Sequence, residues 1–172
     1  QKQGHRAVRM SVNIAAQQLQ NGQLPALIAA CLAETGLDPQ WLELELTEST
    51  LIGQADSIRR QLTELRDMGV RLAIDDFGTG YSSLSYLRHF PISTLKIDQS
   101  FVRGLPEVRE DVALVRSIVA LANGLALEVI AEGIETEQQA AFFAEFPGMI
   151  AQGYLFSRPQ PFEQLLDAAS QA

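Results

Sequence analysis

The sequence alternates short apolar stretches with longer amphipathic ones along its length, and this alternation limits the possible folds. Six stretches have the composition or two-residue periodicity of strands, namely residues 7–14, 41–46, 70–74, 94–97, 127–131 and 149–151. Helical patterns cover residues 24–34, 55–68, 83–88, 107–123, 137–146 and 162–169. Regular alternation of strands and helices predicts an α/β protein built on a parallel sheet.

A polar side chain that could contact a metal ion or a phosphate group stands at the end of every predicted strand. In chain order these residues are Asn13, Glu45, Asp75 with Asp76, Lys96, Glu132 and Gln152. Their spacing suits the strand–helix units of a barrel of about 250 residues, in which the carboxyl ends of the strands share one face. Each has an ordinary explanation alone: a salt bridge for Lys96, a turn for Gln152, a helix start for Glu132. Together they predict a catalytic face.

The third predicted strand runs directly into two adjacent aspartates, Asp75 and Asp76. Aspartate is a poor strand residue and is rarely buried unpaired, so two of them at the end of a buried strand require a counter-charge. A divalent metal ion supplies that charge most simply. The alternative is an aspartate-rich turn that caps the next helix, with Ser82 or Ser83 as the N-cap.

The side chains at the strand ends form an all-oxygen ligand set of carboxylates and one amide. Such a set suits Mg²⁺ or Mn²⁺, and zinc is a poorer candidate because no histidines and cysteines converge. Two ions held by Asp75 and Asp76 could clamp the attacking and leaving oxygens of a phosphoryl displacement. Lys96 would then orient the attacking water or stabilise charge on the phosphate. The glycines that follow would let the next loop fold tightly over the site.

The composition argues against binding to nucleic acid, insertion into a membrane and secretion. The 172 residues carry a formal net charge of −8, whereas binding to a DNA or RNA polymer needs a basic surface. No apolar run reaches the length of a membrane span, and residues 1–9 lack the apolar core of a signal peptide. The only cysteine is Cys31, so a disulfide framework is excluded, which fits cytoplasmic surroundings. Its position in an apolar run predicts that Cys31 is a buried small hydrophobe.

Six motifs, taken together, resemble the EAL-domain family. They are Ser11-Val12-Asn13, Glu45-Leu46-Thr47-Glu48-Ser49, the block Asp-Asp-Phe-Gly-Thr-Gly-Tyr-Ser-Ser-Leu at 75–84, Leu95-Lys96-Ile97-Asp98, Ala131-Glu132-Gly133-Ile134-Glu135 and Gln152-Gly153-Tyr154. Members of this family are bacterial phosphodiesterases that cut cyclic-di-GMP to linear pGpG with Mg²⁺ or Mn²⁺. The motifs follow the family order along essentially the whole chain. The resemblance therefore implies this activity and an EAL-type, TIM-like (β/α)8 barrel over residues 1–172.

The resemblance also implies a role for each matching residue. The ligands of the first metal ion would be Asn13, Glu45 and Asp75, and those of the second Asp75, Asp76 and Glu132. Lys96 would lie near the nucleophilic water, and Gln152 would help to hold a metal-bound water. Glu48 and Glu135 would stabilise the loop at residues 77–83 and the far side of the pocket. The loop residues expected at the substrate are Phe77, Gly78, Thr79, Gly80, Tyr81 and Ser82.

One part of the family pattern has no counterpart in this sequence. The Glu-Ala-Leu signature, whose glutamate binds the first metal ion, is absent together with about two strands. We therefore expect these residues to be the C-terminal part of a longer domain, because an open barrel would leave strand edges unpaired. The resemblance further implies a parent protein with a sensory or GGDEF domain, which a membrane segment could tether, and makes a homodimer plausible.

Two other functions remain open. A degenerate member of the family could bind cyclic-di-GMP as a sensor without cutting it, although such members usually lack metal ligands that are present here. An unrelated phosphate-processing barrel is the third alternative, and the specificity of the Asp-Asp-Phe-Gly-Thr-Gly block argues against it.

Overall fold

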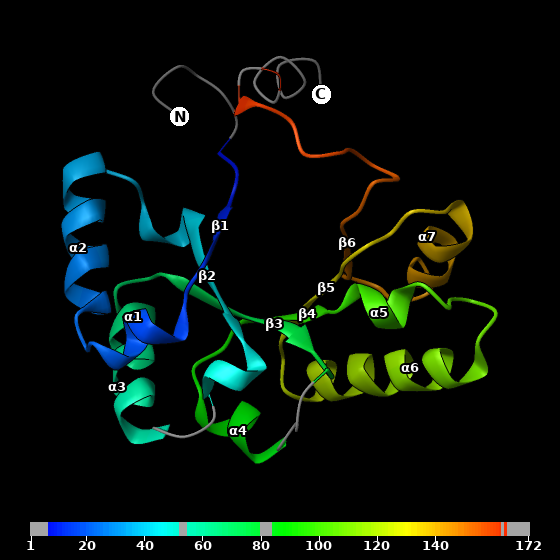
Figure 1. The fold of residues 1–172 in the computed structure, drawn as a ribbon, viewed down its shortest axis with the longest axis horizontal. Coiled ribbons are helices and arrows are strands. Elements are labelled where there is room, and N and C mark those ends of the chain that lie inside the picture. The colour runs from blue at the N-terminus through cyan, green and yellow to red at the C-terminus, as the bar shows by residue number, and fades with distance from the viewer. Residues whose placement is uncertain (1–6, 52–54, 80–83, 163, 165–172) are drawn as a thin grey trace.

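The structure is a computed structural model that describes residues 7–51, 55–79, 84–162 and 164 (Figure 1). Its elements are β1 (Met10–Asn13), α1 (Ala16–Gln20), α2 (Leu24–Thr35), β2 (Leu42–Thr47), α3 (Ala55–Asp67), β3 (Arg71–Phe77), α4 (Leu84–His89), β4 (Thr94–Ile97), α5 (Gln99–Val102), α6 (Arg109–Gly124), β5 (Glu128–Ala131), α7 (Glu137–Phe143) and β6 (Ile150–Ala151). Two 3₁₀ helices flank β2, at Pro39–Trp41 and Glu48–Leu51. No helix in these ranges is both long and apolar enough to cross a bilayer.

The six strands form one parallel sheet in which every strand pairs with the next one along the chain. This sheet curls into a half-barrel. In a flat sheet, β1 and β5 would lie about 19 Å apart, yet Arg9, just before β1, makes a 2.6 Å ion pair with Glu128 on β5. Figure 1 shows α1–α3 grouped beside β1 and β2, and α5–α7 beside β4–β6. The predicted parallel α/β architecture is confirmed as a partial barrel.

The two faces of the sheet have opposite chemistry. The outward-facing residues Leu44, Ile74 and Leu95 are buried in a hydrophobic core that includes Leu62 of α3 and Val115 of α6. Several of the alternate, inward-facing positions carry charged side chains, of which Glu43, Glu45 and Lys96 are buried. Branched apolar residues usually fill the interior of such barrels. Apolar packing is therefore concentrated in the outer layer, whereas buried charged groups lie in the interior.

Most of the predicted elements are confirmed, with shifts of a few residues at their ends. The sequence did not predict α1, α5 or the two 3₁₀ helices, all of which are short. Most of the helix predicted at 162–169 lies outside the described residues. The prediction for Cys31 was wrong, because this residue is exposed on α2. Leu24, Ile28 and Leu32 form the inward stripe of that helix at four-residue spacing, and Cys31 falls beside the stripe.

The segment after β6 is held tightly against the turn that follows β5. The Ile134 amide donates to the carbonyl of Gln152 at 3.0 Å, and the amide of Leu155 donates to the carbonyl of Ile134 at 3.0 Å. Gly153 lies between these bonds, and a Cβ at this position would collide with the Ile134 backbone. The close backbone approach therefore requires glycine at position 153.

Gly153→Ala is expected to lower the free energy of unfolding by about 3 kcal/mol, because the backbone atoms it meets cannot move aside as a flexible side chain would. Gly124→Ala is the matched control. Gly124 closes α6, and a Cβ there would meet nothing within 4 Å, so we expect no loss or a gain of up to about 1 kcal/mol. Urea unfolding monitored by circular dichroism measures both, and equal stability of the two variants would contradict the packing described.

Candidate metal centre

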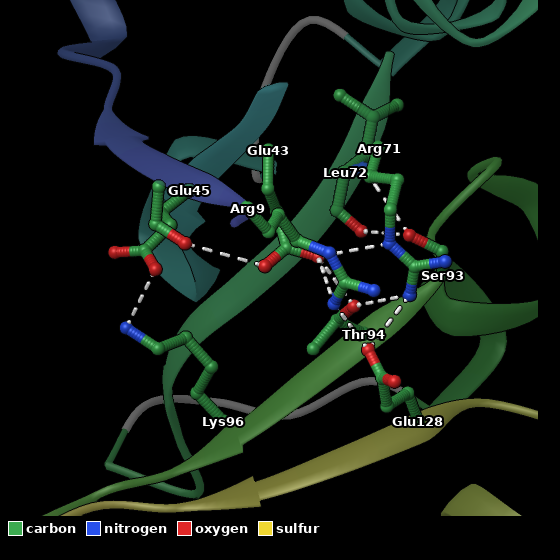
Figure 2. A network of polar contacts seen from close by, with 10 residues as sticks. Arg9, Glu43, Glu45, Arg71, Leu72, Ser93, Thr94, Lys96 and Glu128 are labelled. Carbon is green, nitrogen blue, oxygen red and sulfur yellow. Dashed lines mark hydrogen bonds and ion pairs between the residues drawn. The ribbon is translucent and has the colours of Figure 1, made fainter. Parts of the chain in front are cut away.

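The carboxyl ends of β2–β5 bring four of the predicted site residues into direct contact. Nζ of Lys96, on β4, lies 2.9 Å from Oε1 of Glu45 on β2 and 3.2 Å from Oδ1 of Asp75 on β3. It lies 2.6 Å from Oε1 of Glu132, which directly follows β5. Figure 2 shows Lys96 extending toward Glu45 inside the half-barrel. Residues that are far apart in sequence therefore meet at one ammonium group.

Lys96 remains positively charged in this environment, although its side chain is only 6 % exposed. Burial alone would lower its pKa, but the hydrogen bonds with Glu132 and Glu45 outweigh burial and raise the pKa above its ordinary value. The ammonium group is consequently a fixed cation at neutral pH.

One ammonium does not balance the surrounding carboxylates. Asp75, Asp76 and Glu132 each offer an oxygen, and these oxygens lie within 4.8 Å of one another. Burial raises the pKa of Glu132 despite its contact with Lys96, and burial together with the charges of Asp75 and Asp98 raises the pKa of Asp76. The donor set is hard oxygen with an excess of negative charge, and it fits a divalent cation such as Mg²⁺ or Mn²⁺.

A β-bulge at the end of β3 brings the two adjacent aspartates together. Ile74 pairs with Leu95 and Phe77 pairs with Ile97, so β3 has one residue more than β4 between these pairs. Asp76 has a φ of 54°, and its amide donates to Oδ1 of Asp75 at 3.1 Å. A left-handed φ is uncommon outside glycine but is tolerated by aspartate. Phe77 is consequently buried in the core, 4 % exposed.

The turn after β3 is anchored by the 3₁₀ helix that follows β2. Oε2 of Glu48 accepts a hydrogen bond of 3.4 Å from the amide of Gly78, and Oγ1 of Thr79 donates to the carbonyl of Asp76 at 2.8 Å. Gly78 has a φ of 99°, and a Cβ there would meet the ring of Phe101. Gly80, Tyr81 and Ser82, which the sequence also places in this loop, lie outside the described residues.

The other predicted residues lie around the mouth of the half-barrel. Asn13 ends β1 and is the register partner of Glu45, with its side chain exposed. Gln152 is exposed, and its amide donates to the carbonyl of Ala131 at 2.8 Å, beside Glu132. Glu135 is exposed just before α7, and its amide donates to the side chain of Gln139. No described side-chain hydrogen bond or ion pair links these three residues to the cluster around Lys96.

Sequence reasoning gave Asp98 no role, although it belongs to this cluster. Its side chain accepts a hydrogen bond from the amide of Ser100 at the start of α5, at 2.9 Å. Burial alone would raise the pKa of Asp98, but the hydrogen bonds from Ser100 and the interaction with Asp76 lower it. Its position in the sequence could have identified it. Asp98 follows Lys96 by two residues, so the two side chains point to the same side of β4.

Comparison with known proteins yields one family and close structural neighbours. A family model described as the EAL domain matches residues 1–159. Cyclic di-GMP phosphodiesterase NbdA of Pseudomonas aeruginosa is 45% identical over 162 residues, which cover 94% of this chain and 21% of NbdA. The chain thus spans about a fifth of the length of that relative.

Two solved structures connect the fold with a ligand and a metal. A c-di-GMP complex of the PaMucR phosphodiesterase has a TM-score of 0.90 and 43% identity, covering 95% of this chain and 66% of that one. A manganese and c-di-GMP complex of Klebsiella pneumoniae BlrP1 has a TM-score of 0.82 and 33% identity, covering 92% of this chain and 40% of that one.

Lys96→Met is expected to destabilise the metal-free protein by about 3 kcal/mol at pH 8, because it leaves buried carboxylates without their cation. The loss should be smaller at pH 5. Burial already raises the pKa of Glu132 above its ordinary 4.5, and removing the ammonium raises it further. A carboxyl whose pKa is higher folded than unfolded stabilises the fold at low pH, and this contribution is lost as the pH rises through the folded pKa.

Urea unfolding in EDTA at both pH values measures this effect. Arg59→Met is the control, since its ion pair with Asp56 is exposed; its removal should change stability by less than about 1 kcal/mol at either pH. An equal loss at pH 5 and pH 8 for Lys96→Met would contradict the charge balance described.

Proposed function

The chain belongs to the EAL domain family, and on that premise we propose that it hydrolyses cyclic-di-GMP to linear pGpG with bound divalent metal ions. The observation that carries the proposal is the excess of carboxylates around Lys96 at the mouth of the half-barrel. The names of NbdA and of the PaMucR and BlrP1 complexes support the choice of substrate. The BlrP1 complex supports a divalent metal, for which we propose Mg²⁺ or Mn²⁺.

We assign two groups of ligands to the ions. Asp75, Asp76 and Glu132 would hold one of them, which their mutual distances of at most 4.8 Å support. Asp75 would also serve the other ion together with Glu45 and Asn13, which are paired in register at the ends of β2 and β1. Bound there, the ions would neutralise charge that develops on the phosphate during in-line displacement.

The remaining residues would position the reactants. Lys96 would donate a hydrogen bond to the attacking water or to a phosphate oxygen. Glu48 would keep the turn after Asp76 in place through the amide of Gly78. We assign Gln152 and Glu135 to the pocket wall. The loop residues assigned to the substrate are Gly78, Thr79, Gly80, Tyr81 and Ser82, whereas Phe77, which the resemblance also places there, is buried in the core.

Asp75→Asn is expected to reduce the formation of pGpG by about a hundredfold or more, because it removes the one charge shared by both ligand groups. The assay uses the full-length protein with cyclic-di-GMP and Mg²⁺ or Mn²⁺, and separates the products by chromatography. Asp67→Asn is the matched control, since Asp67 lies at the exposed end of α3, and its activity should equal that of wild type.

Two measurements on the same full-length protein distinguish an enzyme from a sensor. Calorimetry with Ca²⁺ and cyclic-di-GMP measures binding, and the product assay measures turnover. Binding of the dinucleotide by the wild-type protein without pGpG under Mg²⁺ or Mn²⁺ would replace the proposed hydrolase with a sensor. Full turnover by Asp75→Asn would overturn the assignment of the ligands.

A further inference from the structure

A second group of polar side chains lies inside the half-barrel, deeper than the metal centre (Figure 2). We call it the basal ion layer, and its members are Arg9, Glu43, Arg71, Thr94 and Glu128. Arg9 precedes β1, Glu43 lies on β2, and the other three begin β3, β4 and β5. The layer therefore joins all the strands that carry the carboxylates around Lys96.

The basal ion layer is closely connected. Oγ1 of Thr94 donates to Oε1 of Glu43 at 2.6 Å and accepts from Nη2 of Arg71 at 3.2 Å. The same Nη2 donates to Glu128 at 2.8 Å, and Nη1 of Arg9 donates to Glu128 at 2.6 Å. Glu43 and Thr94 are 1 % and 0 % exposed. Two arginines balance two glutamates, so the layer has no surplus charge with which to attract an ion.

The Glu43–Thr94 bond repeats, one step deeper, the contact between Glu45 and Lys96. Residues two apart on a strand face the same side, so Glu43 lies below Glu45 on β2, and Thr94 lies below Lys96 on β4. Both contacts bridge β2 and β4, which are not adjacent because β3 lies between them. On β3, the register partner of both Glu45 and Thr94 is Ala73, whose small side chain leaves room for these bridges.

We propose that the basal ion layer fixes the separation of β2, β4 and β5 at which the carboxylates meet to hold metal. Thr94 and Glu43 are accordingly positioning residues, which act on the ligands Glu45 and Glu132 through the strands. This inference rests on the metal site of the proposed function and extends it to residues that belong to no ligand set. Mutation of the partners that orient metal ligands typically lowers metal affinity or activity about 10- to 100-fold.

Thr94→Val tests the inference, because it removes the hydroxyl and nearly preserves the volume. Mn²⁺ affinity of the full-length protein, measured from the electron paramagnetic resonance signal of free Mn²⁺, should fall about tenfold. Thr94→Ser is the matched control, since it keeps the hydroxyl and loses only a methyl group, and its affinity should stay within about twofold of wild type. All measurements are made below the unfolding transition of each variant.

Glu128→Gln provides a second arm if Thr94→Val does not fold. The side chain of Glu128 is 29 % exposed, so the loss of its charge is better tolerated than a change at a fully buried residue. We expect Glu128→Gln to lower the Mn²⁺ affinity, as Thr94→Val does. Wild-type affinity in Thr94→Val, or in Glu128→Gln when only that variant folds, would overturn the positioning role. Failure of the wild-type protein to bind Mn²⁺ would instead overturn the metal site of the proposed function.

Discussion

The contact of one lysine with three carboxylates is the constraint on which this structure depends. Lys96 is buried, and a charge out of water needs a partner with good geometry. Glu45, Asp75 and Glu132 supply it from three other points of the sheet. The sheet must curl to bring these residues together, which fixes the half-barrel and places the site at its mouth.

The interior contains two layers with different charge balance. The basal ion layer has equal numbers of arginines and glutamates and satisfies its own charges. At the mouth, Lys96 faces three carboxylates, and Asp76 and Asp98 lie close by. A low local dielectric magnifies such an imbalance. The deeper layer can therefore serve as framework, whereas the mouth keeps a surplus of negative charge that the proposed metal ions would balance.

The residues at the mouth of the half-barrel could be predicted from the sequence, because they are defined by their position at strand ends. Short-range sequence patterns reveal where strands end. Polar residues at strand ends identified Glu45, Asp75, Lys96 and Glu132 as neighbours, and their contacts confirm that proximity. The basal ion layer escaped notice because charged residues at strand starts, such as Arg71 and Glu128, look like ordinary solvated ends. Their partners depend on how far the sheet curls and tilts, which local periodicity does not contain. Cys31 was misplaced for a similar reason, since an apolar run does not say which helix face is buried.

The β-bulge in β3 lets two adjacent aspartates lie at the mouth together, although neighbouring residues of a regular strand face opposite sides. In a regular strand, side chains alternate between the two faces, so Asp75 and Asp76 could not both face the interior. Without the bulge, Asp76 would face the apolar helices and Phe77 the charged interior. The extra residue restores Phe77 to the phase of Ile97, in the hydrophobic core, and leaves Asp76 at the mouth beside Asp75. The unusual φ of Asp76 is thus the conformational cost of placing two carboxylates together while one aromatic ring stays buried.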